Sequence, residues 1–242
     1  MDETIKTTIL RPDPVGTIEG MRDTGYDFNH ALADIVDNSV DADATEINIT
    51  IEMDQGGVFI SVADNGYGMD EDTLIRGMQY GGKGADNPKR LGKFGLGLKT
   101  ASTAFCRKLK VITKDGKESR LLKATWDLDH VASVGEWELL LGGTSKFEKD
   151  TLEETASGSS GTLVIWDEID RVLKDYDDPT GSYARTSLKK KVDKFRHHAA
   201  MTFQRYLDPE DKRARNIRMT LNEENIIHWD PFCLKEMGGD RK

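Results

Sequence analysis

The stretch DIVDNSVDADA, residues 34–44, decides the fold. It places five acidic or amide side chains within ten positions, at Asp34, Asp37, Asn38, Asp41 and Asp43. Aspartate and asparagine are weak helix formers, because their short polar side chains compete for nearby backbone groups. A segment that only had to be helical would use other residues, so this one is expected to hold a ligand.

The residues around this stretch predict a helix with two different faces. One face is apolar, because hydrophobic residues and one serine recur at helical spacing, at Phe28, Leu32, Ile35, Val36 and Ser39. On a helical wheel Asp34, Asn38 and Asp41 lie within about 60° of one another on the opposite side. The polar side chains are therefore gathered on one face.

Composition limits the classes of protein that the chain can represent. At 242 residues and 37% hydrophobic content it can bury a substantial core. The net charge of −9 argues against a chain that binds polyanions over its whole surface. Cys106 and Cys233 lie far apart with no CxxC spacing, which predicts neither a zinc site nor a disulfide framework and fits a reducing cytosol. With no long apolar run or signal peptide, the expectation is a soluble cytoplasmic protein without membrane contact.

The order of periodic segments predicts the fold class. Seven segments read as strands: EINITI, VFISVAD, KLKVIT, RLLKATWD, WELLL, TLVIW and IRMTL. Further helices are expected at Glu71 to Tyr80, Leu96 to Cys106 and Leu188 to Leu207, and Gly142 to Gly161 reads as an exposed polar loop. This order suits an α+β fold, a two-layer α/β sandwich with helices on one face of a mixed, mostly antiparallel sheet.

A glycine turn ends the second predicted strand, in ADNGYGM, residues 63–69. An acid at a strand end, Asp64, is followed by Gly66 and Gly68, whose backbone can come close to a ligand because it has no Cβ. Alone the DxGxG pattern is weak, since a hairpin or strand-to-helix turn with a solvated aspartate gives the same residues.

A glycine-rich segment follows at residues 77–97. It has seven glycines in 21 residues and runs into a helix-competent stretch, whereas average usage predicts between one and two glycines. Glycines before a helix N-terminus leave free N–H groups that favour an anion, and Lys83 and Lys93 add positive charge, so a triphosphate suits the site. The Walker A and dinucleotide fingerprints are absent. A flexible surface linker is the other interpretation.

Taken together, these motifs resemble the GHKL ATPases, which include gyrase B subunits, heat-shock chaperones, sensor histidine kinases, MutL and MORC proteins. The resemblance rests on the asparagine-bearing helix DIVDNSVDA, the turn DNGYG, the lid end GKFGLG and the later Gly161-Thr162 pair, in that order over residues 31–165. The lid and the WDEID continuation look most similar to MORC-type and related bacterial ATP-binding proteins. The family fold is the Bergerat fold, which has the two-layer architecture predicted above.

The resemblance implies a role for each motif, with ATP and Mg²⁺ as cofactors. Asn38 would coordinate Mg²⁺ through its amide oxygen, with phosphate and water oxygens completing the shell. Asp64 would accept a hydrogen bond from the adenine amino group, Thr162 would lie beside it, and Met69 would pack on the base. The predicted nucleotide-binding set is Asn38, Asp41, Ala42, Asp64, Gly66, Gly68, Met69, Gly82, Lys83, Gly92, Lys93, Phe94, Gly95, Leu96, Gly97, Leu98 and Thr162.

The sequence departs from the family at the expected general base. A glutamate usually stands four residues before the asparagine, and here that position is Asp34. Aspartate is shorter by one methylene, roughly 1.5 Å, and a small misplacement of a catalytic group can cost about 100-fold in rate. Hydrolysis is therefore less firmly implied than binding, and Asp34 could instead only order water. Asp37 is a poorer candidate for the base by its wheel position, and Asp41 and Asp43 are expected to be structural.

The expected organisation is an N-terminal strap at residues 1–20, an ATP-binding domain at 21–180 with a lid at about 77–97, and a last part at 181–242. That last part would end the ATPase domain or begin a further one. Between Arg185 and Arg218, eleven Lys or Arg face four acids, a local balance of +7. A solvated helix face is favoured for this stretch over a DNA contact.

The predicted function is Mg²⁺-dependent ATP binding with slow hydrolysis, in which lid closure is coupled to a conformational change or to an ATP-dependent homodimer. Two alternatives stay open. A nucleotide-sensing scaffold without turnover would explain Asp34. A histidine-kinase catalytic domain would need a phosphoacceptor histidine on a preceding helix, and only about 30 residues precede the motif.

Overall fold

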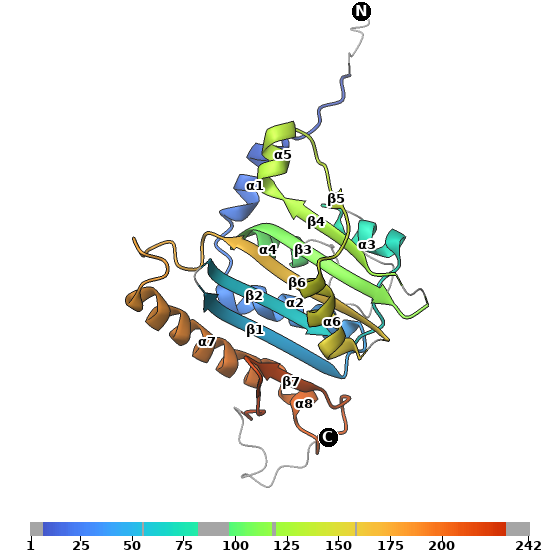
Figure 1. Cartoon of the computed structure of the whole chain (residues 1–242), viewed down its shortest axis with the longest axis vertical. Coiled ribbons are helices and arrows are strands. Elements are labelled where there is room, and N and C mark those ends of the chain that lie inside the picture. Colours follow the sequence, from blue (N-terminus) through green and yellow to red (C-terminus); the bar gives the residue numbers. More distant parts are fainter. Residues whose placement is uncertain (1–6, 55, 82–96, 118–119, 158, 231–242) are drawn as a thin grey trace, which may run out of the picture.

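The computed structural model describes residues 7–54, 56–81, 97–117, 120–157 and 159–230. Its centre is one sheet of eight strands in the order β5-β4-β3-β6-β2-β1-β7-β8 (Figure 1). Every neighbouring pair is antiparallel except β1 and β7. The strands are β1 (Glu46–Asp54), β2 (Gly57–Asp64), β3 (Cys106–Asp115), β4 (Leu122–Asp127), β5 (Leu140–Leu141), β6 (Ser160–Ile169), β7 (Arg218–Leu221) and β8 (Glu224–Asn225).

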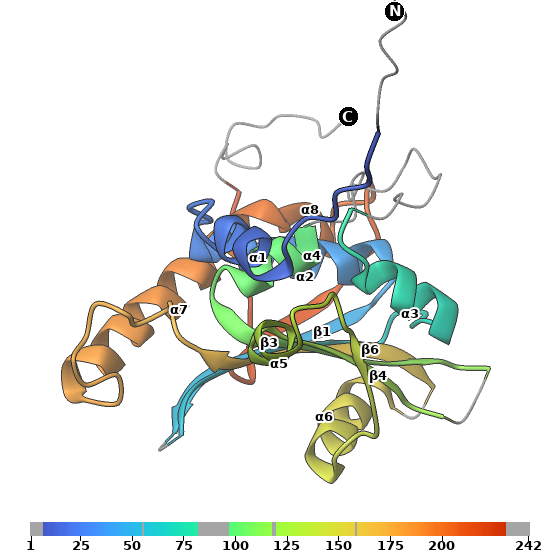
Figure 2. The ribbon, with the colours of Figure 1, turned by 90° about the horizontal axis from the view of Figure 1, so that it is seen from above.

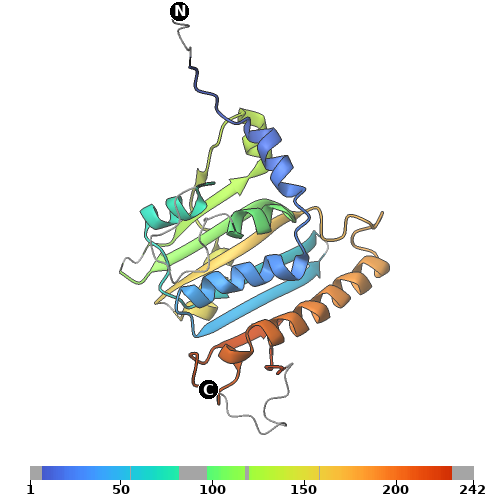
Figure 3. The ribbon, with the colours of Figure 1, turned by 180° about the vertical axis from the view of Figure 1, so that it is seen from behind.

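Most of the helices cover one face of this sheet. In Figure 3 α2 and α4 lie side by side across it, and α7 runs along its edge near β1. The helices are α1 (Pro14–Arg22), α2 (Phe28–Asp41), α3 (Glu71–Met78), α4 (Gly97–Thr103), α5 (Leu128–Val134), α6 (Lys146–Ala156), α7 (Ser182–Thr202) and α8 (Gln204–Leu207). The predicted α+β sandwich with a mixed, mostly antiparallel sheet is confirmed.

The main core lies between the helices and the sheet, and the strand alternation explains its composition. Along β1, Ile47, Ile49 and Ile51 are buried toward the helices, whereas the residues between them are more exposed. From α2, the apolar stripe of Leu32 and Val36 enters the same core, as the sequence predicted. Asp27 is the N-cap of α2, and its carboxylate accepts hydrogen bonds from the amides of Asn29 and His30.

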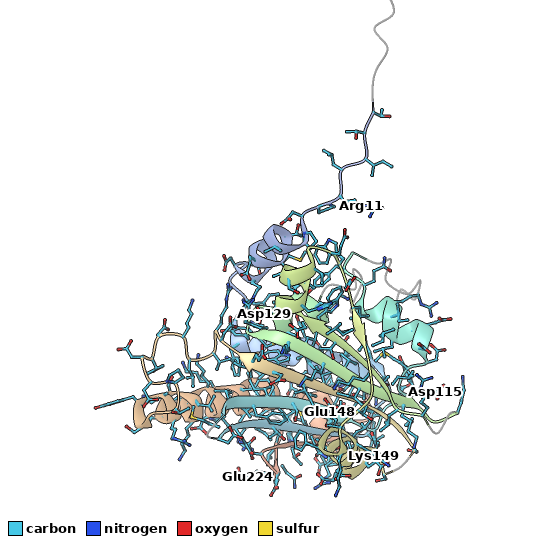
Figure 4. All side chains as sticks on the ribbon, turned by 45° about the horizontal axis from the view of Figure 1, so that its top comes forward. Arg11, Asp115, Asp129, Glu148, Lys149 and Glu224 are labelled. Atoms are coloured by element: carbon cyan, nitrogen blue, oxygen red, sulfur yellow. The ribbon has the colours of Figure 1, made fainter. Side chains whose placement is uncertain are left out.

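Helix α6 corrects the reading of residues 142–161 as a loop. It begins with a capping box, in which Ser145 accepts from the Glu148 amide and the Glu148 carboxylate accepts from the Ser145 amide. Leu152 and Ala156 then pack with Ile112 on the opposite face of the sheet. Figure 2 shows α6 alone below the sheet, with α1, α2 and α4 above it, and Figure 4 labels Glu148 and Lys149 there. The prediction was wrong because polar residues dominate the segment and hide its short apolar face.

Other boundaries differ more modestly from the prediction. The segment read as the strand WELLL pairs only through Leu140 and Leu141, opposite β4. The helix expected from Leu188 to Leu207 is divided at Phe203 into α7 and α8. Strand β7 pairs in parallel with β1, which places residues 218–221 in the central sheet. In the part of the chain that is described, no helix combines the length and the apolar character needed to cross a bilayer.

Candidate functional site

Asp64 ends β2 and is almost completely buried. Ser39 on α2 donates a hydrogen bond from Oγ to Asp64 Oδ2 (2.7 Å), and the amide of Gly66 donates to Oδ1 (2.9 Å). Burial raises the pKa of the Asp64 carboxyl, and the hydrogen bonds from Ser39, Gly66 and the Thr162 backbone oppose that rise. A buried carboxylate held from two sides is a fixed acceptor for a ligand N–H group.

Thr162 lies beside Asp64, as the sequence predicted. Strands β2 and β6 place these two residues opposite each other in the sheet. The Oγ1 atoms of Thr162 and Thr113 are 3.1 Å apart, and Thr113 also donates to the Gly161 carbonyl oxygen (3.0 Å). The amide of Met69 donates to Thr113 Oγ1 (3.0 Å). Thr113 therefore joins the turn after β2 to the Gly161-Thr162 pair on β6.

The turn after Asp64 also packs directly on the end of α2. The amide of Tyr67 donates to the carbonyl oxygen of Ala42 (3.0 Å), which is the C-cap of the helix. A Cβ at Gly66 would lie 2.6 Å from the same carbonyl oxygen, closer than real Cβ contacts allow. Glycine at position 66 is therefore required for α2 and the end of β2 to meet.

Asp34 and Asn38 lie one turn apart on the same helix, close to this junction. The Asn38 side chain is exposed, and its Nδ2 donates to the Asp34 carbonyl oxygen (2.7 Å), which leaves the amide oxygen as an acceptor. Burial raises the pKa of Asp37 to about 6, and the charges of Asp34 and Asp41 add to the rise. The helix thus concentrates negative charge and hard oxygen atoms around Asn38. These donors fit Mg²⁺, which takes few protein ligands and prefers oxygen.

Asp43 was expected to have a structural role, and it forms an ion pair with Arg215. Arg215 Nη1 pairs with its carboxylate (3.0 Å), and Arg215 Nε donates to the Ala44 carbonyl oxygen (3.1 Å). Arg215 also donates to the carbonyl oxygen of Val40 in the last turn of α2. A cation that hydrogen-bonds the carbonyls of a helix C-terminus stabilises that end. The arginine therefore fixes the C-terminal end of α2 that carries Asn38.

The predicted phosphate-binding segment is described only at its end. Gly97 begins α4, and a Cβ there would lie 3.9 Å from Asp34 Oδ2, so α4 starts beside the acidic face of α2. Leu98 packs against the core. Seven other predicted residues lie outside the described residues: Gly82, Lys83, Gly92, Lys93, Phe94, Gly95 and Leu96.

Sequence reasoning missed two polar residues of this site. Ser39 was counted with the apolar stripe of α2, although a hydroxyl on a buried face needs a polar partner. That requirement was the available signal, and the partner is Asp64. Thr113 ends a strand-like segment, and no local pattern indicates that it meets residues 69 and 162.

The basic stretch from residue 185 to 218 covers most of α7, all of α8, the segment that follows α8 and the first residue of β7. Among the described residues, acids pair with four of its eleven cations, in Arg196–Glu224, Arg213–Asp211, Arg215–Asp43 and Arg218–Glu46. A groove of about 470 Å³ lies between α7 and the ends of β1 and β8, with Arg185, Lys189 and Arg196 among its lining residues. Acids line the same groove, including Glu52, Asp193 and Glu224.

Comparison with known proteins agrees with this geometry. Residues 26–162, more than half of the chain, match the family model described as histidine kinase-, DNA gyrase B- and HSP90-like ATPases. ATPase morc-1 of Caenorhabditis elegans is 32% identical over 194 residues, which cover 67% of this chain and 22% of that protein. ATPase MORC2B of Mus musculus is 38% identical, and ATPase MORC2 of Homo sapiens 36% identical, each over 89 residues.

The two mammalian matches cover 35% of this chain and 9% of each relative. The matched part of the chain thus spans between 9% and 22% of the length of these three relatives. The family match covers Asp34, Asn38, Asp64 and Thr162, the residues around which the site is built. The chain belongs to the family of histidine kinase-, DNA gyrase B- and HSP90-like ATPases.

Proposed function

We propose that this domain binds ATP with Mg²⁺ and hydrolyses it slowly. The observation that carries the proposal is the meeting of α2 with the end of β2, where Ser39 bonds to Asp64 one residue from Asn38. This contact keeps the buried Asp64 carboxylate and the exposed Asn38 amide on adjoining elements, and we assign the first to adenine and the second to the metal. The relatives are themselves named ATPases.

In the proposed site Asp64 accepts a hydrogen bond from the adenine amino group, and Thr162 offers a second polar contact next to it. Met69 packs on the base. Asn38 holds Mg²⁺, which when bound neutralises phosphate charge. Residues 77–97 cover the phosphates, a role that rests on their glycine and lysine content.

In the hydrolytic step Asp34 acts as the general base. An oxygen–phosphorus bond forms between water and the γ-phosphorus, and the bond from the γ-phosphorus to the bridging oxygen breaks. ADP leaves with the electron pair of that bond, and the proton of the water passes to the Asp34 carboxylate and then to solvent.

Phosphate release tests whether the domain is an ATPase or a nucleotide sensor without turnover. We expect Asp34→Glu to be at least as active as the wild type, because it restores the usual reach, and Asn38→Ala to be inactive. Asn216→Ala is the matched control, since Asn216 is also exposed and also donates to a backbone carbonyl, that of Tyr206. Binding of ATP without turnover in the wild type and in Asp34→Glu would identify a sensor.

We further propose that ATP promotes a homodimer, since ordering a lid and an N-terminal strap around ATP can create a surface for a second copy. Light scattering with and without a non-hydrolysable ATP analogue tests this step, and an unchanged mass contradicts it.

The chain is proposed to act as one ATPase domain, because β7 joins the sheet beside β1. DNA contact through residues 185–218 is not favoured, because among the described residues acids pair with four of its cations and also line the neighbouring groove.

A further inference from the structure

A tyrosine outside the predicted motifs contacts the proposed general base. Tyr26 donates its hydroxyl to Asp34 Oδ2 at 2.7 Å. It lies immediately before Asp27, the N-cap of α2, and its ring is partly buried against the core. Both the ring and the helix that carries Asp34 are therefore fixed by packing.

The bond engages one oxygen of the Asp34 carboxylate and leaves the other, Oδ1, as an acceptor. Within the described residues, Tyr26 is the only side chain that donates a hydrogen bond to this carboxylate. The Asp34 carbonyl oxygen is held separately by Asn38. A hydrogen bond of this length limits rotation of the carboxylate about its χ angles.

We propose that Tyr26 is a positioning residue, which orients Asp34 so that the shorter carboxylate can serve as the base that activates water. This inference rests on the proposed hydrolysis. A glutamate at position 34 would reach further by itself, whereas an aspartate has little tolerance for a wrong orientation. Tyr26 thus compensates for the missing methylene: its hydrogen bond to Oδ2 fixes the carboxylate of Asp34, and with it the position of Oδ1.

A purely structural role for the hydroxyl predicts a different pattern of effects. In that case its removal would lower stability or ATP affinity, and the effect would not depend on which acid stands at position 34. A positioning role predicts a loss in kcat alone, and that loss should be relieved by the longer acid. The two roles are distinguished by whether the effect of removing the Tyr26 hydroxyl depends on the acid at position 34.

The experiment compares the wild type, Tyr26→Phe, Asp34→Glu and the double variant. Phenylalanine keeps the packed ring, and Tyr183→Phe is the control, because Tyr183 is 83% exposed and lies on α7. For each protein the measurements are kcat and KM from phosphate release, the Kd for Mg-ATP by calorimetry, and the urea midpoint. Asn38→Ala supplies the background rate.

We expect Tyr26→Phe to lower kcat at least about 10-fold, with KM and Kd changed less than about twofold. In the Asp34→Glu background the same substitution should change kcat by less than about twofold.

An equal loss in both backgrounds, or a loss confined to KM, overturns the inference. If the wild type turns over and Tyr26→Phe matches it, the inference fails while the proposed function stands. If the wild type and Asp34→Glu bind ATP but release no phosphate, both fail.

Discussion

Gly68 shows how a single residue fixes the end of the sheet that carries the proposed nucleotide site. Its φ of +66° lies in the left-handed region, and a Cβ there would lie 1.9 Å from the carbonyl oxygen of Lys114 at the end of β3. The backbone conformation of Gly68 and its close packing against β3 both require glycine. The glycines of the DxGxG motif thus have a structural role, which is independent of the proposed contact with a ligand.

Substituting Gly68 by alanine should therefore be far more harmful than the same change at a glycine with free space. Gly25 is the matched control, because its φ is +74° and nothing lies within 4 Å of a Cβ there. We expect Gly25→Ala to lower the free energy of unfolding by about 1–2 kcal/mol, the cost of the left-handed conformation. Gly68→Ala should lose at least about 2 kcal/mol more. Equal urea midpoints for the two variants would contradict this account.

Some residues of the candidate site could be predicted from the sequence, because short-range patterns in the chain indicate them. Asn38 and Asp34 share a helix face that the wheel defines, and Asp64 ends a strand with a recognisable glycine turn. Ser39 and Tyr26 act through tertiary contacts, which a helical wheel cannot predict. The partner of Ser39 is 25 residues away on another element, and the Tyr26 bond depends on how the chain enters α2.

Among the elements, the C-terminal end of α3 is held by two buried donors. Lys99 on α4 donates to the Gly77 carbonyl oxygen (2.5 Å), and Trp126 Nε1 donates to that of Met78 (2.8 Å). The Lys99 ammonium also lies 5.9 Å from the centre of the Tyr80 ring. These contacts satisfy carbonyls that a helix end leaves without partners. The Lys99 contact joins α3 to α4, and the Trp126 contact joins α3 to β4.

The buried Lys99 should make stability depend on pH in a specific window. Burial lowers its pKa to about 8, so between pH 8 and about 10.5 the unfolded chain binds more protons and stability from this residue rises with pH. We expect Lys99→Met to remove up to about 3 kcal/mol of that rise. Urea unfolding of both ligand-free proteins at pH 8 and pH 10 measures the difference. The same pH dependence in both proteins would show that Lys99 does not titrate as described.

At this scale the sequence predicted long periodic elements better than short polar ones. Helix α2 and strand β1 have a periodicity that the core confirms, whereas the second half of β2 is buried on both faces of the sheet. Helix α6 was missed, although Ser145 and Glu148 show the spacing of a capping box. Its apolar face has few residues, and the sheet face that it covers could not be known before the strands were placed.

Across the whole molecule, the site depends on parts far apart in the chain. Helix α2 supplies Asp34, Asn38 and Ser39, β2 supplies Asp64, and β6 supplies Thr162 from about 100 residues later. Arg215 holds the end of α2 from beyond α8. Because the sheet order places β6 next to β2, Asp64 and Thr162 become neighbours only when these two strands pair.

The most direct test of the central claim is calorimetry of ATP binding with and without magnesium. We predict that the wild type binds ATP at millimolar Mg²⁺. Asp64→Asn should bind ATP at least about 10-fold more weakly, because it loses a carboxylate acceptor. The ATP affinity of Asn38→Ala should respond little to Mg²⁺. Asp54→Asn, which alters an exposed acid at the end of β1, should bind like the wild type. No detectable binding by the folded wild type, or unchanged affinity in Asp64→Asn, would contradict the account.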